Sequence, residues 1–240
     1  MSFSLTLKKS ASLVNSSAAG ILLVDKEVGS TSFRLVSILR KRTKIQKIGH
    51  CGTLDPFATG VMVMLVGRDY TRRSDEFLSS DKSYKATLQL GTTTDSFDLE
   101  GAITSQSDLI PTFEEVEKAI ASFQGEISQV PPMYSAKKIG GKKLYDLARK
   151  GITVEREAVK VQLEVKLVQY NYPKLEIEVS CSKGTYIRSL AHDIGQLLKC
   201  GAHLIQLTRT RSGSFNLDQC ISQEDLQNPE FNLEPYFQKL

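Results

Sequence analysis

The chain has 240 residues, of which 40% are hydrophobic and 24% are charged, and Lys and Arg outnumber Asp and Glu by 31 to 27. This length and composition predict one globular domain, or one domain with a small insertion, and exclude disordered and fibrous proteins. The longest apolar runs, at 21–24 and 61–66, are far shorter than the roughly 20 residues that span a bilayer, so no integral membrane protein is expected.

The first half of the chain is predicted to mix strands, helices and two long loops. Residues 1–19 are expected to form a flexible tail, because the segment after Lys8 and Lys9 is too polar for a signal-peptide core. Periodicity and turn residues then predict a buried strand at 21–25, a helix from about 31 to 42, a loop at 49–60 and a second buried strand at 61–67. A polar helix ending near 78 and a half-buried strand at 84–91 are predicted next. They are followed by an acidic loop at 91–101 and an amphipathic helix at 113–123.

The second half is predicted to contain a long hairpin. The patterning indicates a loop at 129–141, a short helix at 143–150, strands at 159–170 and 175–181, a helix at 186–198, a strand at 203–211 and a helical turn at 222–226. The two long strands are separated only by Asn-Tyr-Pro, which favours a hairpin. Because strands and helices do not alternate strictly, the predicted fold class is α+β with a largely antiparallel sheet.

The four cysteines give no sign of a metal site or of a disulfide framework. They are widely spaced, at Cys51, Cys181, Cys200 and Cys220, with no C-x-x-C pair, and the chain has only three His. We therefore expect no metal, and a reducing cytoplasm as the location.

The charges are separated along the chain. Segment 28–54 has six basic residues and no acid, segment 137–150 has six basic residues and one acid, and segment 95–117 has seven acids and no base. Each basic segment taken alone fits a solvated surface. Gly and Tyr interleaved with Lys in SAKKIGGKKLY favour a polyanionic partner, because glycine lets the backbone follow phosphates that lysines neutralise.

The loop KIGHCGTLDPFATG is the first candidate for chemistry. Asp55 lies between a basic helix and a buried strand, and Pro56 stiffens the loop, so the carboxylate can serve as a nucleophile or a base. An ordinary Asp-Pro turn explains the same residues and is the more common situation. His50 is open to three interpretations: a base, a ligand or a surface histidine.

The segment SCSKGTYIRSLAHDIG is the second candidate. Gly184 ends a strand and a helix begins with Tyr186 and Arg188, at a type of junction where sites are often built. An arginine there can hold a partner carboxylate ionised. A surface arginine beside a packed aromatic is the alternative, and for Tyr84, alone at a strand end, packing is favoured.

Five segments, in this order, resemble the tRNA pseudouridine synthase family that modifies uridine 55 in the T-loop. The resemblance covers residues 20–226 and is carried by GHCGTLDPFATGV, SYKATLQLGTTTDSFDLEG, QVPPMYSAKKIGGKKLYDLARKG, CSKGTYIRSLAHDIG and CGAHLIQLTRTRSGSF. It implies a pseudouridine synthase catalytic domain at 20–226, with an RNA-clamping insertion at 129–151 and a short acidic tail at 227–240 in place of the C-terminal RNA-binding domain of many members.

The resemblance also implies roles for single residues. Asp55 matches the catalytic aspartate, and Arg188 matches the arginine that pairs with it. Tyr84 matches the tyrosine that stacks on the target base and acts as a base. Tyr186 and Leu207 match residues that contact the uridine.

Four further residues match supporting positions of the family. Asp98 and Arg149 match members of a charged network behind the catalytic aspartate. His50 matches the histidine that fills the space of the extruded nucleotide, and Lys138 matches a lysine of the RNA-clamping insertion. Positive charge on the RNA side is expected from the first helix, from the insertion and from the strand that carries Arg209 and Arg211.

The implied reaction fits the residue types that are present. Converting uridine to pseudouridine breaks N1–C1′ and joins C5 to C1′ without redox change, so no cofactor and no metal are expected. The implied partner is the T-arm of tRNA, bound by a cytoplasmic monomer with no obligate protein partner. Two alternatives remain: an RNA chaperone that opens the tRNA elbow, for which isomerisation is secondary, and the same chemistry on another RNA with guide and protein partners.

Overall fold

The structure is a computed structural model that describes residues 18–135 and 137–239. The predicted tail lies mostly outside these residues. The strands of the described part are β1 (Gly20–Lys26), β2 (Ile48–Cys51), β3 (Thr59–Val66), β4 (Lys82–Leu90), β5 (Thr92–Thr94), β6 (Ile103–Gln106), β7 (Gly125–Gln129), β8 (Lys138–Ile139), β9 (Lys142–Lys143), β10 (Val159–Asn171), β11 (Lys174–Cys181), β12 (Ala202–Ser212), β13 (Phe215–Asn216) and β14 (Ile221–Ser222).

The helices are fewer and flank the sheet. They are α1 (Ser32–Thr43), α2 (Arg68–Thr71), α3 (Ser74–Leu78), α4 (Phe113–Ala121), α5 (Leu144–Ala148), α6 (Ile187–Leu197) and α7 (Gln223–Gln227), with short 3-10 turns at Leu217–Gln219 and Glu234–Tyr236. Of the described residues, none belongs to a helix long and apolar enough to cross a membrane.

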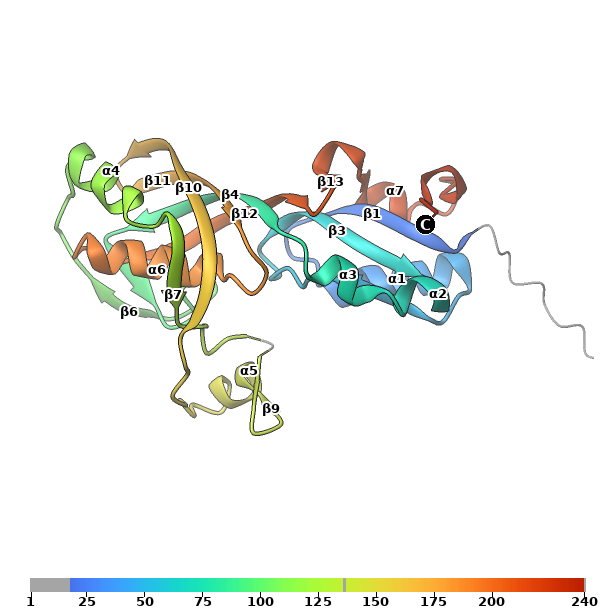
Figure 1. Ribbon diagram of the computed structural model, residues 1–240, viewed down its shortest axis with the longest axis horizontal. Helices are drawn as coiled ribbons and strands as arrows, with labels where there is room; N and C mark the ends of the chain where they lie inside the picture. The colour runs from blue at the N-terminus through green and yellow to red at the C-terminus, as the bar shows by residue number, and fades with distance from the viewer. Residues whose placement is uncertain (1–17, 136, 240) are drawn as a thin grey trace, which may run out of the picture.

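One mixed sheet runs along the length of the molecule (Figure 1). Its path is β14-β1-β3-β12-β4-β11-β10-β7, with β2 paired to β3 and β13 paired to β12. Only β1 with β14 and β3 with β12 pair in parallel, and the other neighbours are antiparallel. The predicted α+β class is therefore confirmed.

The apolar runs of β1 (residues 21–24) and β3 (residues 61–66) are continuous because both faces of these strands are covered. Alternate residues of β1 belong to two different hydrophobic clusters. Leu22 and Val24 pack in the main core with α1, whereas Ile21 and Leu23 pack in a second cluster with Phe77 of α3. Side chains of successive strand residues point to opposite faces, so burial of both faces removes any polar alternation. This explains why the sequence shows two continuous hydrophobic runs here.

Short elements at the sheet edges were not predicted. β2 occupies the start of the loop expected at 49–60, and β7 adds an edge strand beside β10. β5 and β6 form a two-stranded ribbon that begins within the predicted acidic loop. These strands have at most five residues, which is too short for periodicity to reveal, and they are stabilised by pairing with other strands.

The insertion lies away from the sheet. Figure 1 shows α5 and β9 projecting below the strands, at the end of the connection from β7 to β10. β8 and β9 form a small ribbon around Gly140 and Gly141, both of which have positive φ. The excursion runs from the end of β7 at Gln129 to the start of β10 at Val159, and the RNA-clamping role of residues 129–151 stays a prediction.

Residues after α7 pack on the core. Leu233 and Phe237 are each 7% exposed and belong to the main hydrophobic cluster. The backbone of Gln238 exchanges two 2.9 Å hydrogen bonds with Ile21 of β1, and Arg42 of α1 donates to the carbonyl of Leu226 at 2.7 Å. The segment expected as an acidic tail is therefore anchored to the first strand and the first helix over the described residues.

Candidate active site

A cleft of about 690 Å³ opens where the Asp55 loop, β4, the acidic loop, the insertion and the start of α6 meet. Of the nine residues that the family resemblance singled out, seven line it: Asp55, Tyr84, Asp98, Arg149, Tyr186, Arg188 and Leu207. They come from segments up to about 150 residues apart, so the tertiary fold alone assembles them. This convergence of charged and aromatic groups in one concave site identifies the candidate active site.

The Asp55 loop is held in place by buried polar side chains. The Ser32 hydroxyl of α1 accepts a hydrogen bond from the Leu54 amide at 3.1 Å. The Lys26 ammonium, at the end of β1, donates to the carbonyls of Ser30 (2.8 Å) and Pro56 (3.2 Å). Burial lowers the pKa of Lys26 to about 8. These contacts fix the backbone on both sides of Asp55 and make it more than a simple Asp-Pro turn.

Arg188 binds Asp55 with two nitrogen atoms. Its Nε lies 2.9 Å from Oδ2 of Asp55, and its Nη2 lies 3.2 Å from Oδ1. The arginine side chain is 6% exposed and the aspartate side chain is 34% exposed. A two-point contact between a planar guanidinium and a carboxylate fixes orientation as well as charge. Asp55 thus presents its carboxylate to the cleft in one direction.

The rest of the Arg188 guanidinium is also satisfied. Nη1 lies 3.2 Å from Oδ2 of Asp98 and donates to the Ser96 carbonyl at 3.1 Å, while Nη2 donates to the Tyr134 carbonyl at 2.7 Å. Asp98 accepts further hydrogen bonds from the Ser96 hydroxyl (2.5 Å) and the Glu100 amide (3.0 Å). One arginine therefore joins the Asp55 loop, the acidic loop and the insertion.

The acidic loop reaches Arg188 through an unusual backbone conformation. Phe97 has φ of 65°, and its ring stacks on His192 of α6 with the ring centroids 4.0 Å apart. Left-handed φ is costly for a residue with a side chain, so neighbouring contacts must hold it. Because His192 lies one helical turn after Arg188, the stack ties Asp98 to the helix that carries its partner.

Two carboxylates and one guanidinium make this cluster electrostatically unbalanced. Burial raises the pKa of Asp55, the Arg188 charge opposes that rise, and the neighbouring Asp98 adds to it. The nearby Lys26 acts in the same direction as Arg188. The net effect is a raised pKa, because burial and Asp98 outweigh the two cations, so the Asp55 carboxylate is more basic than an exposed aspartate.

Aromatic and apolar side chains form the walls beside Asp55. Tyr84 of β4 is 8% exposed and Leu207 of β12 is 7% exposed. Tyr186 precedes α6, where no side chain caps the helix; instead the buried Gln129 amide donates to the Tyr186 carbonyl at 3.1 Å and accepts from its N–H at 2.8 Å. A flat base can lie among these walls, above the carboxylate.

The other predicted site residues lie at different places. His50, on β2, does not line the cleft; its Nδ1 is buried without a hydrogen-bond partner in the described part of the chain, and burial lowers its pKa. Arg149 lies on the cleft wall, 5.4 Å from the centre of the Tyr145 ring, and makes no salt bridge with any described carboxylate. Lys138 lies in β8, but its side chain is outside the described residues.

The expected distribution of positive charge needs a correction. Arg209 was expected on an RNA-binding surface, but it is 1% exposed and points into the protein. Arg42 of the first helix is occupied by backbone carbonyls of the C-terminal segment. Residue spacing along a strand or helix does not reveal which neighbours surround a cation, so charge counts overestimated the exposed basic surface.

Sequence reasoning missed Lys26, Gln129 and Arg209 as supporting residues. A lysine at the end of an apolar strand is a signal that could have pointed to Lys26, since lysine seldom ends a buried strand without a partner. Gln129 and Arg209 gave no such signal. Over the described residues, no group of three or more His, Cys, Asp or Glu side chains could hold a metal ion.

Solved structures with this fold define the class of protein. The chain superposes on a protein of a Cbf5-Nop10-Gar1 complex with a TM-score of 0.68 and 28% identity, over 87% of this chain and 54% of that one. A second match is a chain of an H/ACA RNP bound to a substrate RNA containing 2′-deoxyuridine, with a TM-score of 0.64 and 26% identity over 87% of this chain and 52% of that one. The chain thus spans about half the length of these structural relatives, and its fold is that of pseudouridine synthases.

The sequence relatives are more specific. Residues 40–187 match the TruB family pseudouridylate synthase N-terminal domain, and residues 188–235 match the tRNA pseudouridylate synthase B C-terminal domain. The chain is 60% identical to tRNA pseudouridine synthase B of Protochlamydia amoebophila, over 90% of this chain and 83% of that one. It is 55% identical to that of Chlamydia trachomatis serovar L2, over 93% of each chain. The chain belongs to the TruB family and is an RNA pseudouridine synthase.

Proposed function

We propose that this enzyme converts uridine 55 in the T-loop of tRNA to pseudouridine, with Asp55 as the catalytic carboxylate. The observation that carries the proposal is the Asp55–Arg188 pair, with contacts of 2.9 and 3.2 Å, in a cleft walled by Tyr84, Tyr186 and Leu207. The names of the curated relatives support tRNA as the substrate.

The reaction needs a carboxylate beside the sugar and side chains that hold the base, and the cleft contains both. The N1–C1′ bond breaks, the uracil turns, and C5 bonds to C1′; the C5 proton is lost and N1 gains one, so atoms balance without an external reactant. The ionised Asp55 supplies the charge beside the sugar, Tyr84 and Tyr186 hold the base, and Leu207 packs on it. A bound base would displace water from beside the carboxylate, which strengthens the charge interactions.

Binding must first take uridine out of its stack, at a cost of a few kcal/mol. We propose that His50, kept neutral by its environment, occupies the space that the nucleotide leaves. Lys138 and the neighbouring lysines of the insertion contact phosphates, and Asp98 and Arg149 support the charge balance of the site. We place the catalytic residues in a domain at 20–226, on which the C-terminal segment packs, and propose that it acts as a cytoplasmic monomer on the T-arm. The four cysteines are all unpaired, which is consistent with a reducing compartment.

The proposal is tested by replacing the carboxylate alone. Asp55→Asn keeps the shape of the side chain and one acceptor oxygen for Arg188, but it removes the charge. We expect release of tritium from C5-labelled uridine in tRNA to fall by at least about 10³-fold, while the dissociation constant for tRNA changes by less than a factor of about three.

Asp218→Asn is the matched control, because Asp218 is exposed on the turn before β14 and should keep full activity. Full activity of the Asp55 variant would refute the proposal. If the inactive variant refolded tRNA as fast as the unmodified enzyme and replaced it in cells, the chaperone activity would be the better description.

A further inference from the structure

Helix α6 begins without the kind of residue that usually starts a helix. Tyr186 occupies the N-cap position with φ of −110° and ψ of 110°, and its side chain makes no capping hydrogen bond. Serine, threonine, aspartate and asparagine are preferred at this position, because their side chains accept from the first free amides of the helix. The backbone of Tyr186, whose side chain lines the cleft, must therefore be held by other groups.

The turn before Tyr186 imposes little restraint of its own. Lys183 and Gly184 are exposed, and Gly184 has φ of 84°. Apart from its own chain neighbours, no heavy atom lies within 4 Å of the place that a Cβ atom would take at Gly184. The Thr185 hydroxyl donates to the Ser182 carbonyl at 2.9 Å, which closes the turn on itself and does not attach it to the sheet.

Gln129 makes a two-point contact with the backbone of Tyr186. Its Nε2 donates to the Tyr186 carbonyl at 3.1 Å, and its Oε1 accepts from the Tyr186 N–H at 2.8 Å. Because an N–H only donates and a carbonyl only accepts, these partners fix which side of the amide is the oxygen. Gln129 is 0% exposed, so water cannot easily replace either contact when the amide is removed.

Gln129 is also the last residue of β7 before the insertion, and the residues that follow bind the same turn of α6. The Val130 carbonyl accepts from the Ser189 hydroxyl at 2.9 Å. The Tyr134 carbonyl accepts from Arg188 at 2.7 Å. The base of the insertion is thus joined to the start of α6, and Gln129 is the member of this group that holds the N-cap backbone.

We infer that Gln129 is a positioning residue that fixes Tyr186 in the cleft and ties it to the base of the insertion. The inference rests on the proposed function, in which the Tyr186 ring holds the base, and Gln129 itself does not line the cleft. Two hydrogen bonds to one residue prevent rotation of its peptide groups, so the direction in which the ring leaves the backbone is set. A shift of about 1 Å in a group that orients the substrate can lower a rate by up to about 10²-fold.

Gln124 makes the same kind of contact at the other end of β7. Its Nε2 donates to the Val165 carbonyl at 2.6 Å, and its Oε1 accepts from the Val165 N–H at 3.1 Å. Val165 belongs to β10 and does not line the cleft. The two glutamines therefore fasten the two ends of one strand with the same chemistry, and of the two it is Gln129 that acts on a residue of the cleft.

A double-mutant cycle tests the inference. Gln129→Met keeps the length of the side chain and removes both hydrogen-bonding groups, and it should lower the single-turnover rate on tRNA, at saturating enzyme, by about tenfold. In a Tyr186→Ala background the same change should cost less than about twofold, because the ring that Gln129 positions is already absent. The shift in the urea midpoint of unfolding should be equal in the two backgrounds, since the backbone contact is present in both.

Gln124→Met is the matched control. It should lower the urea midpoint as well, because it removes the same groups, but the rate should stay within about twofold in both backgrounds. Should Gln129→Met fail to fold, the cycle is run with Gln129→Asn, whose amide is one methylene too short to reach both groups of Tyr186. A rate loss in this variant that disappears in Tyr186→Ala supports the inference.

A Gln129→Met rate within about twofold of the unmodified enzyme, or a loss that adds in full to Tyr186→Ala, overturns the inference. An equal loss in Gln124→Met also overturns it, because the effect then belongs to β7 as a whole. Asp55→Asn is measured in parallel. An active Asp55→Asn enzyme contradicts the proposed function itself, whereas an inactive one, together with an additive effect of Gln129, contradicts only the role of Gln129.

Discussion

Arg188 is the residue that pairs with both Asp55 and Asp98 in the cleft. It contacts Asp55 and Asp98 with different nitrogens, and its remaining donors bind the carbonyls of Ser96 and Tyr134. The guanidinium thus neutralises charge and joins three separate segments. Lysine could neutralise the charge but could not reach four partners in these directions, because its donors spread from one nitrogen.

Removing Arg188 should therefore be severe. Arg188→Gln leaves two carboxylates without their cation, and we expect the free energy of unfolding to fall by about 3–5 kcal/mol at pH 8. The loss should be smaller at pH 5, because without the arginine the carboxylates take up protons more readily in the folded state. Urea unfolding at the two pH values measures both effects.

The exposed pair of Arg73 with Glu76 provides the control, with side chains 45% and 55% exposed. Arg73→Gln should cost less than about 1 kcal/mol, because water screens this pair. A cost of similar size for the two arginines would contradict the account of Arg188.

At the scale of elements, α6 connects the site to the sheet. Its first turn carries Arg188, its middle carries His192, and its end packs against the start of β12. The close approach occurs at Gly195, where a Cβ atom would lie 2.2 Å from the Ala202 amide nitrogen. A helix that is this tightly seated holds its N-terminal side chains at a fixed height above the sheet.

Gly195→Ala should push α6 away from β12. We expect a loss of about 3 kcal/mol in the free energy of unfolding from overpacking, together with a lower single-turnover rate as Arg188 moves. Ala191→Gly, one turn earlier on the buried face, is the comparison: it should cost about 1 kcal/mol in helix propensity, plus a small cavity, without displacing the helix. Equal rates in the two variants would show that helix seating does not matter to the site.

Asp193, on the same helix, is half-buried and has no hydrogen bond or ion pair to any described residue, and its partial burial raises its pKa to about 6. Because the folded state holds the Asp193 proton more tightly than the unfolded state, protonation stabilises the fold fully at a pH below about 4. This contribution is lost as the pH rises through 6. Asp193→Asn should therefore stabilise the protein by about 1–2 kcal/mol at pH 7.5, and by less at pH 4.5.

Thermal unfolding at both pH values, with Asp225→Asn as a comparison, checks this prediction. Asp225 accepts from Ser222 at the start of α7, so its replacement should weaken that cap and lower stability. A stabilisation by Asp193→Asn that did not change with pH would mean that titration of this carboxylate is not the cause.

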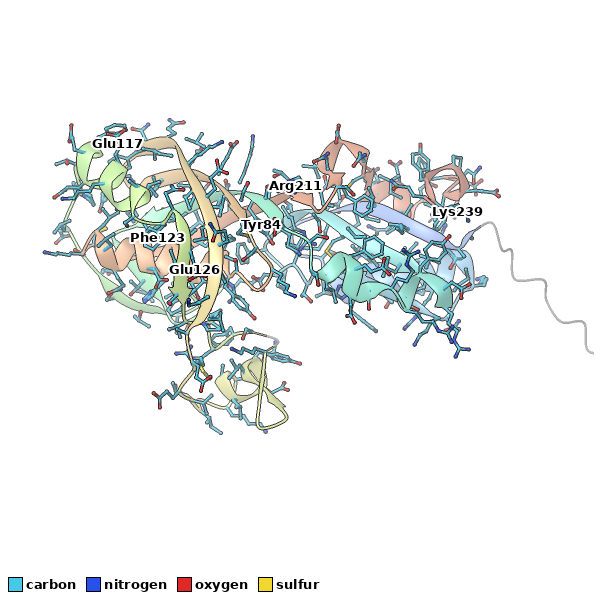
Figure 2. All side chains as sticks on the ribbon, viewed as in Figure 1. Tyr84, Glu117, Phe123, Glu126, Arg211 and Lys239 are labelled. Atoms are coloured by element: carbon cyan, nitrogen blue, oxygen red, sulfur yellow. The ribbon has the colours of Figure 1, made fainter. Side chains whose placement is uncertain are left out.

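At the scale of the whole molecule, the cleft lies where the two halves of the long sheet meet. Figure 2 shows Tyr84 and Arg211 near the middle of the long axis, with Glu117 and Phe123 toward one end and Lys239 at the other. The insertion projects from the same central region (Figure 1). An RNA loop at the cleft can therefore meet the basic insertion without crossing either end of the molecule.

The basic insertion should set the salt dependence of RNA binding. Lys142→Gln combined with Lys143→Gln removes two charges, which should lower the slope of log K against log salt by about one to two units. The single-turnover rate at saturating enzyme should stay unchanged, because no chemical step uses these lysines. Lys118→Gln on α4, remote from the insertion, is the control and should leave the slope as it is. An unchanged slope in the double variant would exclude phosphate contacts there.

Much of the fold was predictable because its signals are local. The apolar runs that become β1 and β3, the Asn-Tyr-Pro turn between β10 and β11 and the amphipathic pattern of α4 depend on residues close in the chain. The candidate residues Asp55 and Arg188 were identified by motif, and the α+β class followed from the order of elements.

The sequence alone determined the family, the order of the longer elements and the residues from which a site could be built, because these depend on residue type and spacing. Only the tertiary structure decided which residues meet. Arg188 reaches Asp55 across 133 positions, and Arg209 is buried while Arg211 on the same strand stays partly exposed. The physical reason is that burial and ion pairing depend on contacts between strands and helices far apart in the chain, which no local pattern records.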